Sequence, residues 1–136
     1  MKKITILFAV VSLSVVAYAG KQERDLVTKE VTPAVEKAES TFKSSCGCTV
    51  KITVDETALK TMDDLRNAKH MAEHVSEGAG KYCTDDASKK AICQMKTLTF
   101  TKGKPAGFTF KDGGGTATTD GQMSCSWEQM TRVLDK

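Results

Sequence analysis

The stretch "KTLTFTKGKPAGFTFKDGGGTATTDG", residues 96–121, has side chains whose character alternates from one residue to the next. Four large apolar residues alternate with polar ones on the two sides of a turn rich in glycine and proline: Leu98, Phe100, Phe108 and Phe110. A period of two is typical of strands that bury one face. After the turn "DGGG", a weaker third strand is expected near 116–119. The stretch therefore predicts a hairpin followed by a third strand.

Helical patterns flank these strands. Outside the strand region the sequence predicts a helix over 31–42, a strand over 49–55, a long helix over 56–80, a short helix over 84–92 and a closing helix over 126–134. We expect Thr32 to cap the first helix, with Pro33 at its first helical position. The order α, β, α, α, β, β, β, α predicts a disulfide-stabilised α+β fold, in which helices pack on one face of a small antiparallel or mixed sheet of about four strands.

Residues 1–19 have the pattern of a secretory signal peptide. A basic start with Lys2 and Lys3 precedes an almost wholly apolar run, and the stretch ends in "AYA", which suits a signal peptidase. The run is shorter than the roughly 20 residues that a membrane-spanning helix needs. We therefore expect a soluble, exported protein that is periplasmic or extracellular and has no membrane span. Residues 20–136 are expected to form a single α+β domain.

The charge of the mature chain gives no sign of a nucleic-acid partner. Without Lys2 and Lys3, 18 basic residues remain against 17 acidic ones, a formal net charge of +1. These basic residues are scattered, and their only adjacent pair is Lys89 and Lys90. Since no basic stripe follows from this distribution, we expect a protein or a small molecule as the partner.

The stretch "HMAEH", from His70 to His74, has the form H-x-x-E-H that one class of zinc peptidases uses. At about 100° per residue, both histidines point about 160° away from the apolar stripe of the long helix. A peptidase also needs a further ligand and a substrate cleft, for which the chain has little material. We therefore interpret them as exposed residues, able at most to share a weak metal site with Asp63 or Glu77, and we expect no resident cofactor.

Five cysteines follow the signal peptide: Cys46, Cys48, Cys83, Cys93 and Cys125. In an exported protein they predict two disulfides and one spare thiol, which either stays free or links two molecules as a dimer. A bond between Cys46 and Cys48 would be strained and readily reduced, as thiol exchange requires. We favour the structural alternative, in which these two cysteines face different partners.

For the pairing, we expect a bond between Cys83 and Cys93, with Cys125 joined to Cys46 or Cys48. An unbroken helix would place Cys83 and Cys93 about 15 Å apart, so this bond requires a bend between them. The polar stretch "TDDAS" could provide it. The alternative is that Cys83 and Cys93 each reach a different element and the segment between them stays straight.

No grouping of Ser, His and an acid suggests a catalytic nucleophile, and Trp127 is interpreted as a cover for the core. We therefore expect an exported binding or interaction protein of unknown ligand rather than an enzyme. The alternative function is thiol-disulfide exchange or metal handling at Cys46-Gly47-Cys48. It requires the sulfurs of Cys46 and Cys48 to be exposed and bonded to each other.

Overall fold

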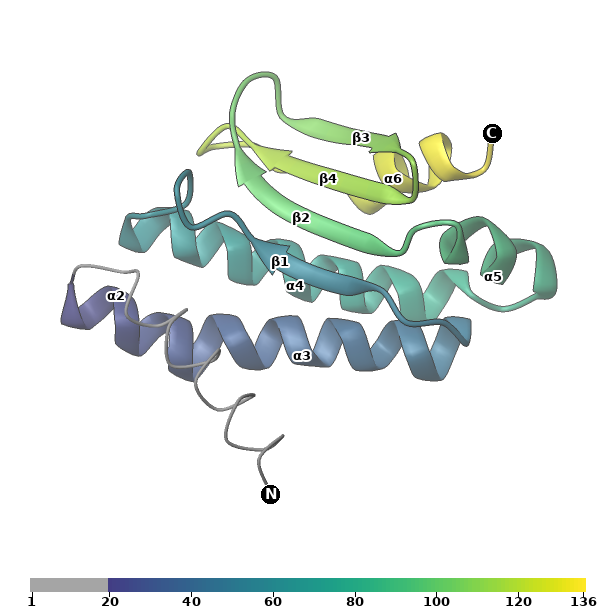
Figure 1. Ribbon diagram of the computed structural model, residues 1–136, viewed down its shortest axis with the longest axis horizontal. Helices are drawn as coiled ribbons and strands as arrows, with labels where there is room; N and C mark the ends of the chain where they lie inside the picture. The colour runs from purple at the N-terminus through teal and green to yellow at the C-terminus, as the bar shows by residue number, and fades with distance from the viewer. Residues whose placement is uncertain (1–19) are drawn as a thin grey trace.

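The computed structural model describes residues 20–136, so the predicted signal peptide lies outside the described residues. It confirms the α+β fold and the expected order of elements after an N-terminal helical rod (Figure 1). The later elements are β1 (Lys51–Val54), α4 (Met62–Tyr82), α5 (Asp86–Cys93), β2 (Thr97–Lys102), β3 (Gly107–Lys111), β4 (Gly114–Thr119) and α6 (Trp127–Leu134). Within residues 20–136, no helix is both long enough and apolar enough to span a bilayer.

The N-terminal rod is longer than the sequence predicts. It joins four helical segments end to end: α2 (Lys21–Leu26), η1 (Val27–Val31), α3 (Thr32–Thr41) and η2 (Phe42–Cys46). The predicted N-cap at Thr32 is wrong, because its backbone is helical and its N–H donates to the carbonyl of Val27. This wide π-helical turn lies just before Pro33. A proline removes one helical hydrogen bond and crowds the preceding turn, and a widened turn accommodates both effects.

The strands form one mixed sheet in the order β1-β2-β4-β3. β1, β2 and β4 are parallel to one another, whereas β3 pairs with β4 in the antiparallel sense. The predicted hairpin between β2 and β3 is therefore wrong, since β4 lies between them. The tight hairpin is β3–β4, where Asp112 (φ 51°) and Gly113 (φ 80°) form a two-residue turn. Both positive φ values suit an Asp-Gly turn, which matches the strand twist better than a longer loop does.

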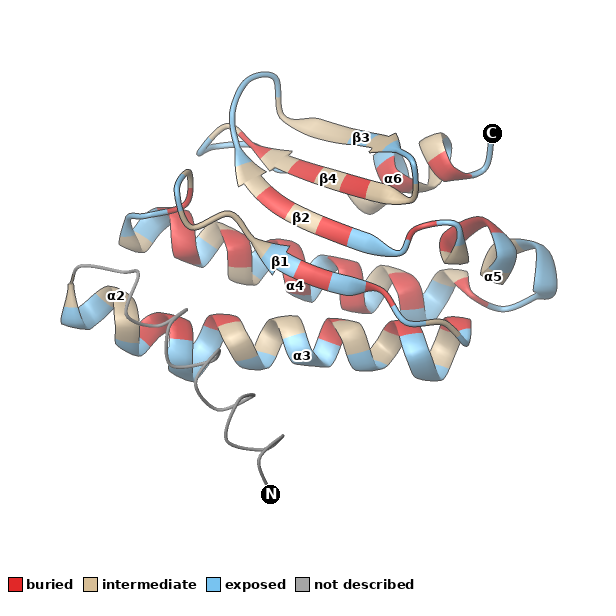
Figure 2. Cartoon of the chain, viewed as in Figure 1, coloured by how far each residue is buried: buried red, intermediate tan, exposed pale blue. Residues whose placement is uncertain are grey.

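The two faces of the sheet have opposite character. Leu98 and Phe100 of β2 point inward and are fully buried, as the alternation predicts. α4 contacts β2 and α6 contacts β3, and both helices lie behind the sheet in Figure 1. The other face is only partly buried or exposed and is dominated by threonines (Figure 2). In register across the four strands it carries Thr53, Thr99, Thr116 and Thr109.

The outer edge of β1 is protected by the rod. The backbone N–H of Ile52 donates to the carboxylate of Glu39 on α3 at 2.8 Å. The ammonium of Lys51 lies 3.8 Å from the same carboxylate. An edge strand with a free N–H group attracts other strands, so the Glu39 carboxylate reduces the tendency of β1 to pair with another chain.

The long helix α4 begins later and ends later than the predicted span 56–80. It starts at a capping box, in which Thr61 Oγ1 accepts the N–H of Asp64 and the Asp64 carboxylate accepts the N–H of Thr61. The preceding residues turn instead around Asp55, which accepts both the N–H and the hydroxyl of Thr57. Gly78 and Gly80 lie inside α4. The local hydrogen bonds of Asp55 and Asp64 thus place the start of the helix after the predicted residue 56.

The disulfides differ from the predicted pairing. Cys46 bonds to Cys83, and Cys48 bonds to Cys93, which leaves Cys125 as the free thiol among the described residues. The expected Cys83–Cys93 bond is wrong, whereas the view that Cys46 and Cys48 face different partners is confirmed. Gly47 between them adopts the left-handed conformation at φ 79°, which ends the rod and sends the chain on toward β1.

Asp64 connects the start of α4 to the sheet. One carboxylate oxygen accepts a hydrogen bond from the ammonium of Lys102 at 2.8 Å. The other accepts hydrogen bonds from the backbone N–H groups of Lys60 and Thr61. Burial alone would raise the pKa of this carboxyl, but these hydrogen bonds hold the pKa below its usual value. The folded state therefore favours the charged carboxylate.

Replacing this buried carboxylate by an amide, Asp64→Asn, should lower the free energy of unfolding by about 1–3 kcal/mol at neutral pH. The lowered pKa means that wild-type Asp64 stabilises the fold above its unfolded-state pKa of about 3.9 and loses that contribution as the pH falls through the folded value. Urea unfolding from pH 7 to pH 3 measures this difference. If the wild type exceeded Asp64→Asn in free energy of unfolding by more at pH 3 than at pH 7, the stabilising role of the charged carboxylate would be contradicted.

Candidate functional site

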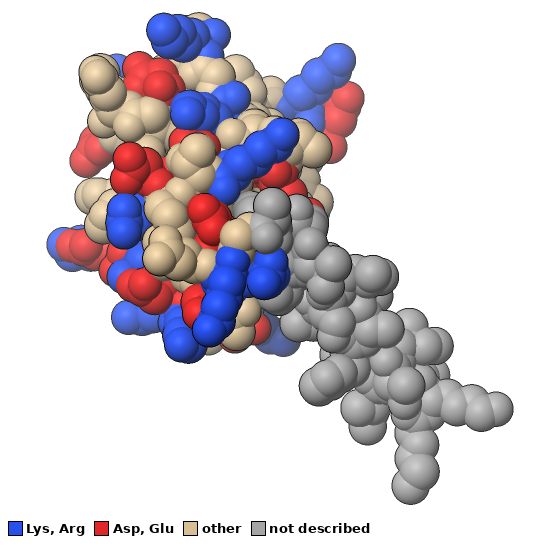
Figure 3. Space-filling model, turned by 90° about the vertical axis from the view of Figure 1, so that its left-hand side faces the viewer, with Lys and Arg blue, Asp and Glu red and all other residues tan. Residues whose placement is uncertain are grey.

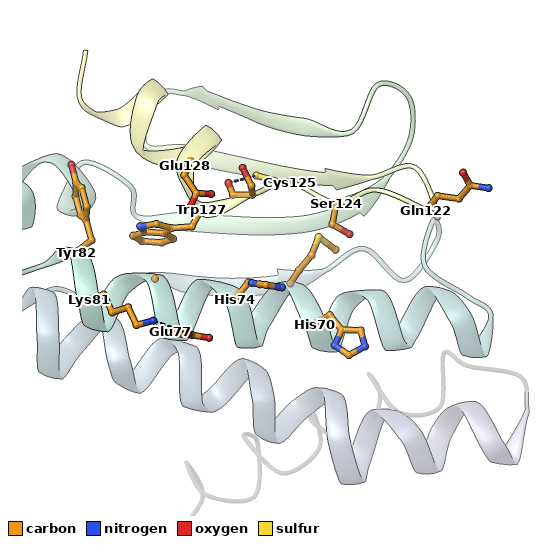
Figure 4. A pocket seen from close by; sticks show the side chains of 13 residues that line it. His70, His74, Glu77, Lys81, Tyr82, Gln122, Ser124, Cys125, Trp127 and Glu128 are labelled. Carbon is orange, nitrogen blue, oxygen red and sulfur yellow. Dashed lines mark hydrogen bonds and ion pairs between the residues drawn. The ribbon is translucent and has the colours of Figure 1, made fainter.

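A groove runs along the exposed side of α4, with a volume of about 730 Å³. One wall is α4, from His70 to Tyr82, and the other is the chain from Gln122 to Glu128 (Figure 4). We call this cavity the α4 groove. We call residues 122–126, which form no helix or strand, the strap.

The strap is attached to α4 near both of its ends. Before it, the side-chain amide of Asn67 donates to the carbonyl of Gly121 at 3.3 Å. After it, Trp127 lies over Gly78 and meets the Tyr82 ring edge-on, with the ring centroids 5.9 Å apart. In Figure 4 the segment runs alongside α4 from Gln122 to Trp127. The groove therefore lies between the helix and a segment that the helix itself positions.

Local hydrogen bonds shape the strap from each side. The Asp120 carboxylate accepts the N–H groups of Gln122 and Met123, and these bonds lower the pKa of Asp120. At the other end, Ser126 and Gln129 form a reciprocal capping box that starts α6. A turn and a helix cap thus fix where the strap begins and ends.

The contact between Trp127 and α4 depends on a glycine. A Cβ atom at Gly78 would overlap the indole ring, so no larger residue fits there without displacing Trp127. Tyr82, the other aromatic neighbour, donates its hydroxyl to the Asp135 carboxylate, and this hydrogen bond is the main cause that raises the pKa of Tyr82 to about 12. The aromatic end of the groove is therefore held by residues from both ends of α6.

The groove combines buried apolar groups with a polar rim. Met71 and Cys125 are buried, and Trp127 is half-buried. Burial raises the pKa of the Cys125 thiol to about 12, so the thiol stays protonated and is a weak nucleophile. His70 and His74 are exposed on the α4 side, which confirms the solvated face that their spacing predicts.

The structure separates the predicted metal candidates into two places. His70, His74 and Glu77 line the α4 groove. Asp63 lies outside the groove and pairs with Arg66 at 3.1 Å. Within the described part of the chain, no three His, Cys, Asp or Glu side chains come together as a metal site.

The groove histidine and carboxylate side chains also have charged neighbours. His70 Nδ1 lies 3.5 Å from the Glu73 carboxylate. Glu77 accepts the ammonium of Lys81 at 2.8 Å, and this contact lowers the pKa of Glu77 and raises that of Lys81. Both signs of charge are thus present on the exposed rim of the groove.

Thiol exchange at Cys46-Gly47-Cys48 would require the sulfurs of Cys46 and Cys48 to be exposed and bonded to each other. Cys46 and Cys48 are not bonded to each other, and Cys46 is buried. The thiol that remains, Cys125, is only 8% exposed, so it is poorly placed to link two molecules. Neither feature favours exchange chemistry at Cys46-Gly47-Cys48.

Comparison of this chain with protein-family models, with curated proteins and with solved structures finds no match.

Sequence reasoning identified His70, His74 and Trp127 individually but not the groove that they share. The strap has no periodic pattern, and its position depends on tertiary contacts with Asn67 and Gly78. One usable signal was present, because "SWEQ" has the spacing of a capping box and marks Ser126 as the end of a loop. A second was Gly78 inside a long helical pattern, which indicates a close approach by another group.

Two glycines that lie two residues apart on α4, Gly78 and Gly80, give a matched test of this packing. Gly78→Ala should lower the free energy of unfolding by about 1–3 kcal/mol, because the methyl group displaces Trp127. Gly80→Ala should instead stabilise the protein by about 0.4–1 kcal/mol, because its Cβ has room and alanine favours the helix. Chemical unfolding and the emission of the single tryptophan measure both effects. Equal effects of the two variants would contradict the Trp127–Gly78 contact.

Proposed function

We propose that this is an exported binding protein whose ligand enters the α4 groove. The observation that carries the proposal is a groove of about 730 Å³ with buried apolar groups at its base and hydrogen-bonding side chains on its rim. Ligand sites are commonly concave and apolar with a few polar groups that fix orientation. In the α4 groove, Met71 and Trp127 provide the apolar surface, and His74 and Ser124 provide polar groups.

Export is the second part of the proposal. Two disulfides are typical of proteins that fold in an oxidising compartment, and residues 1–19 read as a signal peptide. The face seen in Figure 3 intersperses Lys and Arg with Asp and Glu, so it offers no continuous basic surface to a nucleic acid. This pattern supports a protein or small-molecule ligand.

The proposal is tested with a library of small aromatic and amide fragments on the ¹⁵N-labelled oxidised protein. Fragments that enter the groove should shift the signals of the Trp127 indole, Gly78 and Ser124 together, because all three residues line it. The variant Ser124→Phe, on the groove wall, should abolish these shifts, because it adds a bulky ring there and removes the hydrogen bond from the Ser124 hydroxyl to Thr119 that helps to position the strap.

The matched control is Ser40→Phe, which places the same side chain at an exposed site on α3 outside the groove lining. It should leave fragment binding unchanged. Shifts that cluster away from α4 and the strap, or binding that survives in Ser124→Phe, would refute the groove as the ligand site.

A further inference from the structure

The middle of the strap has backbone groups without protein partners. The residues on either side are bonded, since the Met123 carbonyl accepts the N–H of Asp120 and the Ser126 N–H donates to Gln129. Within residues 20–136, however, no hydrogen bond uses the backbone N–H or C=O of Ser124 or Cys125. Cys125 is also 92% buried, and buried backbone groups are nearly always paired. The unpaired groups of buried Cys125 are therefore exceptional, and those of Ser124, which is exposed, are open to a partner from outside.

The geometry of the strap allows such a partner to be another extended chain. Residues 123–126 form no helix, strand or turn, and Ser126 at their end is extended at φ −89° and ψ 157°. In an extended segment, the N–H and C=O of one residue share an edge and the next residue presents the opposite edge. Ser124 and Cys125 both line the groove, so their free N–H and C=O groups belong to its wall.

The length of the groove fits a short peptide. The contacts that attach the strap to α4 are at Asn67 and Gly78, which are eleven residues or about 16 Å apart along the helix. An extended chain advances about 3.3 Å per residue, so five residues span this distance. Alternate side chains of such a peptide would point to the buried apolar groups, and the others to the rim, where Glu77 and Lys81 offer both charges.

From these observations, and resting on the proposed function, we infer that the ligand of the α4 groove is an extended polypeptide segment that adds to the strap by backbone hydrogen bonds. Ser124 or Cys125 provides the donor and acceptor, and Met71 and Trp127 receive an apolar side chain of the peptide. Strand addition is an established mode of peptide recognition, in which backbone bonds give affinity and side-chain pockets give specificity.

The test selects peptides from a random heptapeptide display library on the oxidised protein, with depletion on Ser124→Phe. Selected peptides are then synthesised in two forms, N-methylated at odd or at even positions, and binding is followed by Trp127 emission. One form should lose about tenfold or more in affinity, because its donors face the strap, while the other keeps most of its affinity. Amide exchange at Ser124 or Cys125 should slow in the complex.

Each result bears on the inference separately from the proposed function. Peptides that bind equally well in both methylated forms would overturn strand addition. A library that yields no binder in a protein whose groove does bind fragments would overturn the polypeptide ligand but leave the groove as a binding site. Failure of both peptides and fragments would overturn the proposed function as well. Ser40→Phe is again the matched control and should bind the selected peptides as the wild type does.

Discussion

Two disulfides hold the region where the rod ends against the ends of α4 and α5, because Cys46 and Cys48 bond to different partners. One joins Cys46, the last residue of the rod, to Cys83, which caps α4, and the other joins Cys48, just after the rod, to Cys93, the last residue of α5. The cysteines of each pair are 37 and 45 residues apart, so each bond contributes about 4 kcal/mol in the chain-entropy model. For a chain of this size, whose core is modest, that is a large share of the usual stability.

This constraint makes α4 a firm wall for the groove. Asp64 ties the start of the helix to β2 through Lys102, and Cys83 ties its end to the rod. The strap is then positioned by contacts with α4 near both of its ends, while its middle keeps free backbone groups. A rigid helix beside a locally unpaired segment is a suitable arrangement for receiving a ligand, because little order has to be created on binding.

Local patterns predicted much of the fold and little of the site. The alternation around Leu98 and Phe100 gave strands, because burial of one face imposes a period of two. The order β1-β2-β4-β3 was missed, since it depends on the Asp112-Gly113 turn competing with a longer loop. The disulfide pairing was missed because spacing along the chain does not reveal which helix ends meet in space. The groove was missed for the same reason: nothing local brings Trp127 to Gly78.

Peptide mapping of the oxidised protein without reductant tests the disulfide framework, because the positions of the rod, α4 and α5 follow from which sulfurs are joined. The structure predicts one fragment pair linked by Cys46 and Cys83, a second linked by Cys48 and Cys93, and Cys125 recovered as a free thiol. A bond between Cys83 and Cys93, or any bond that includes Cys125, would contradict it.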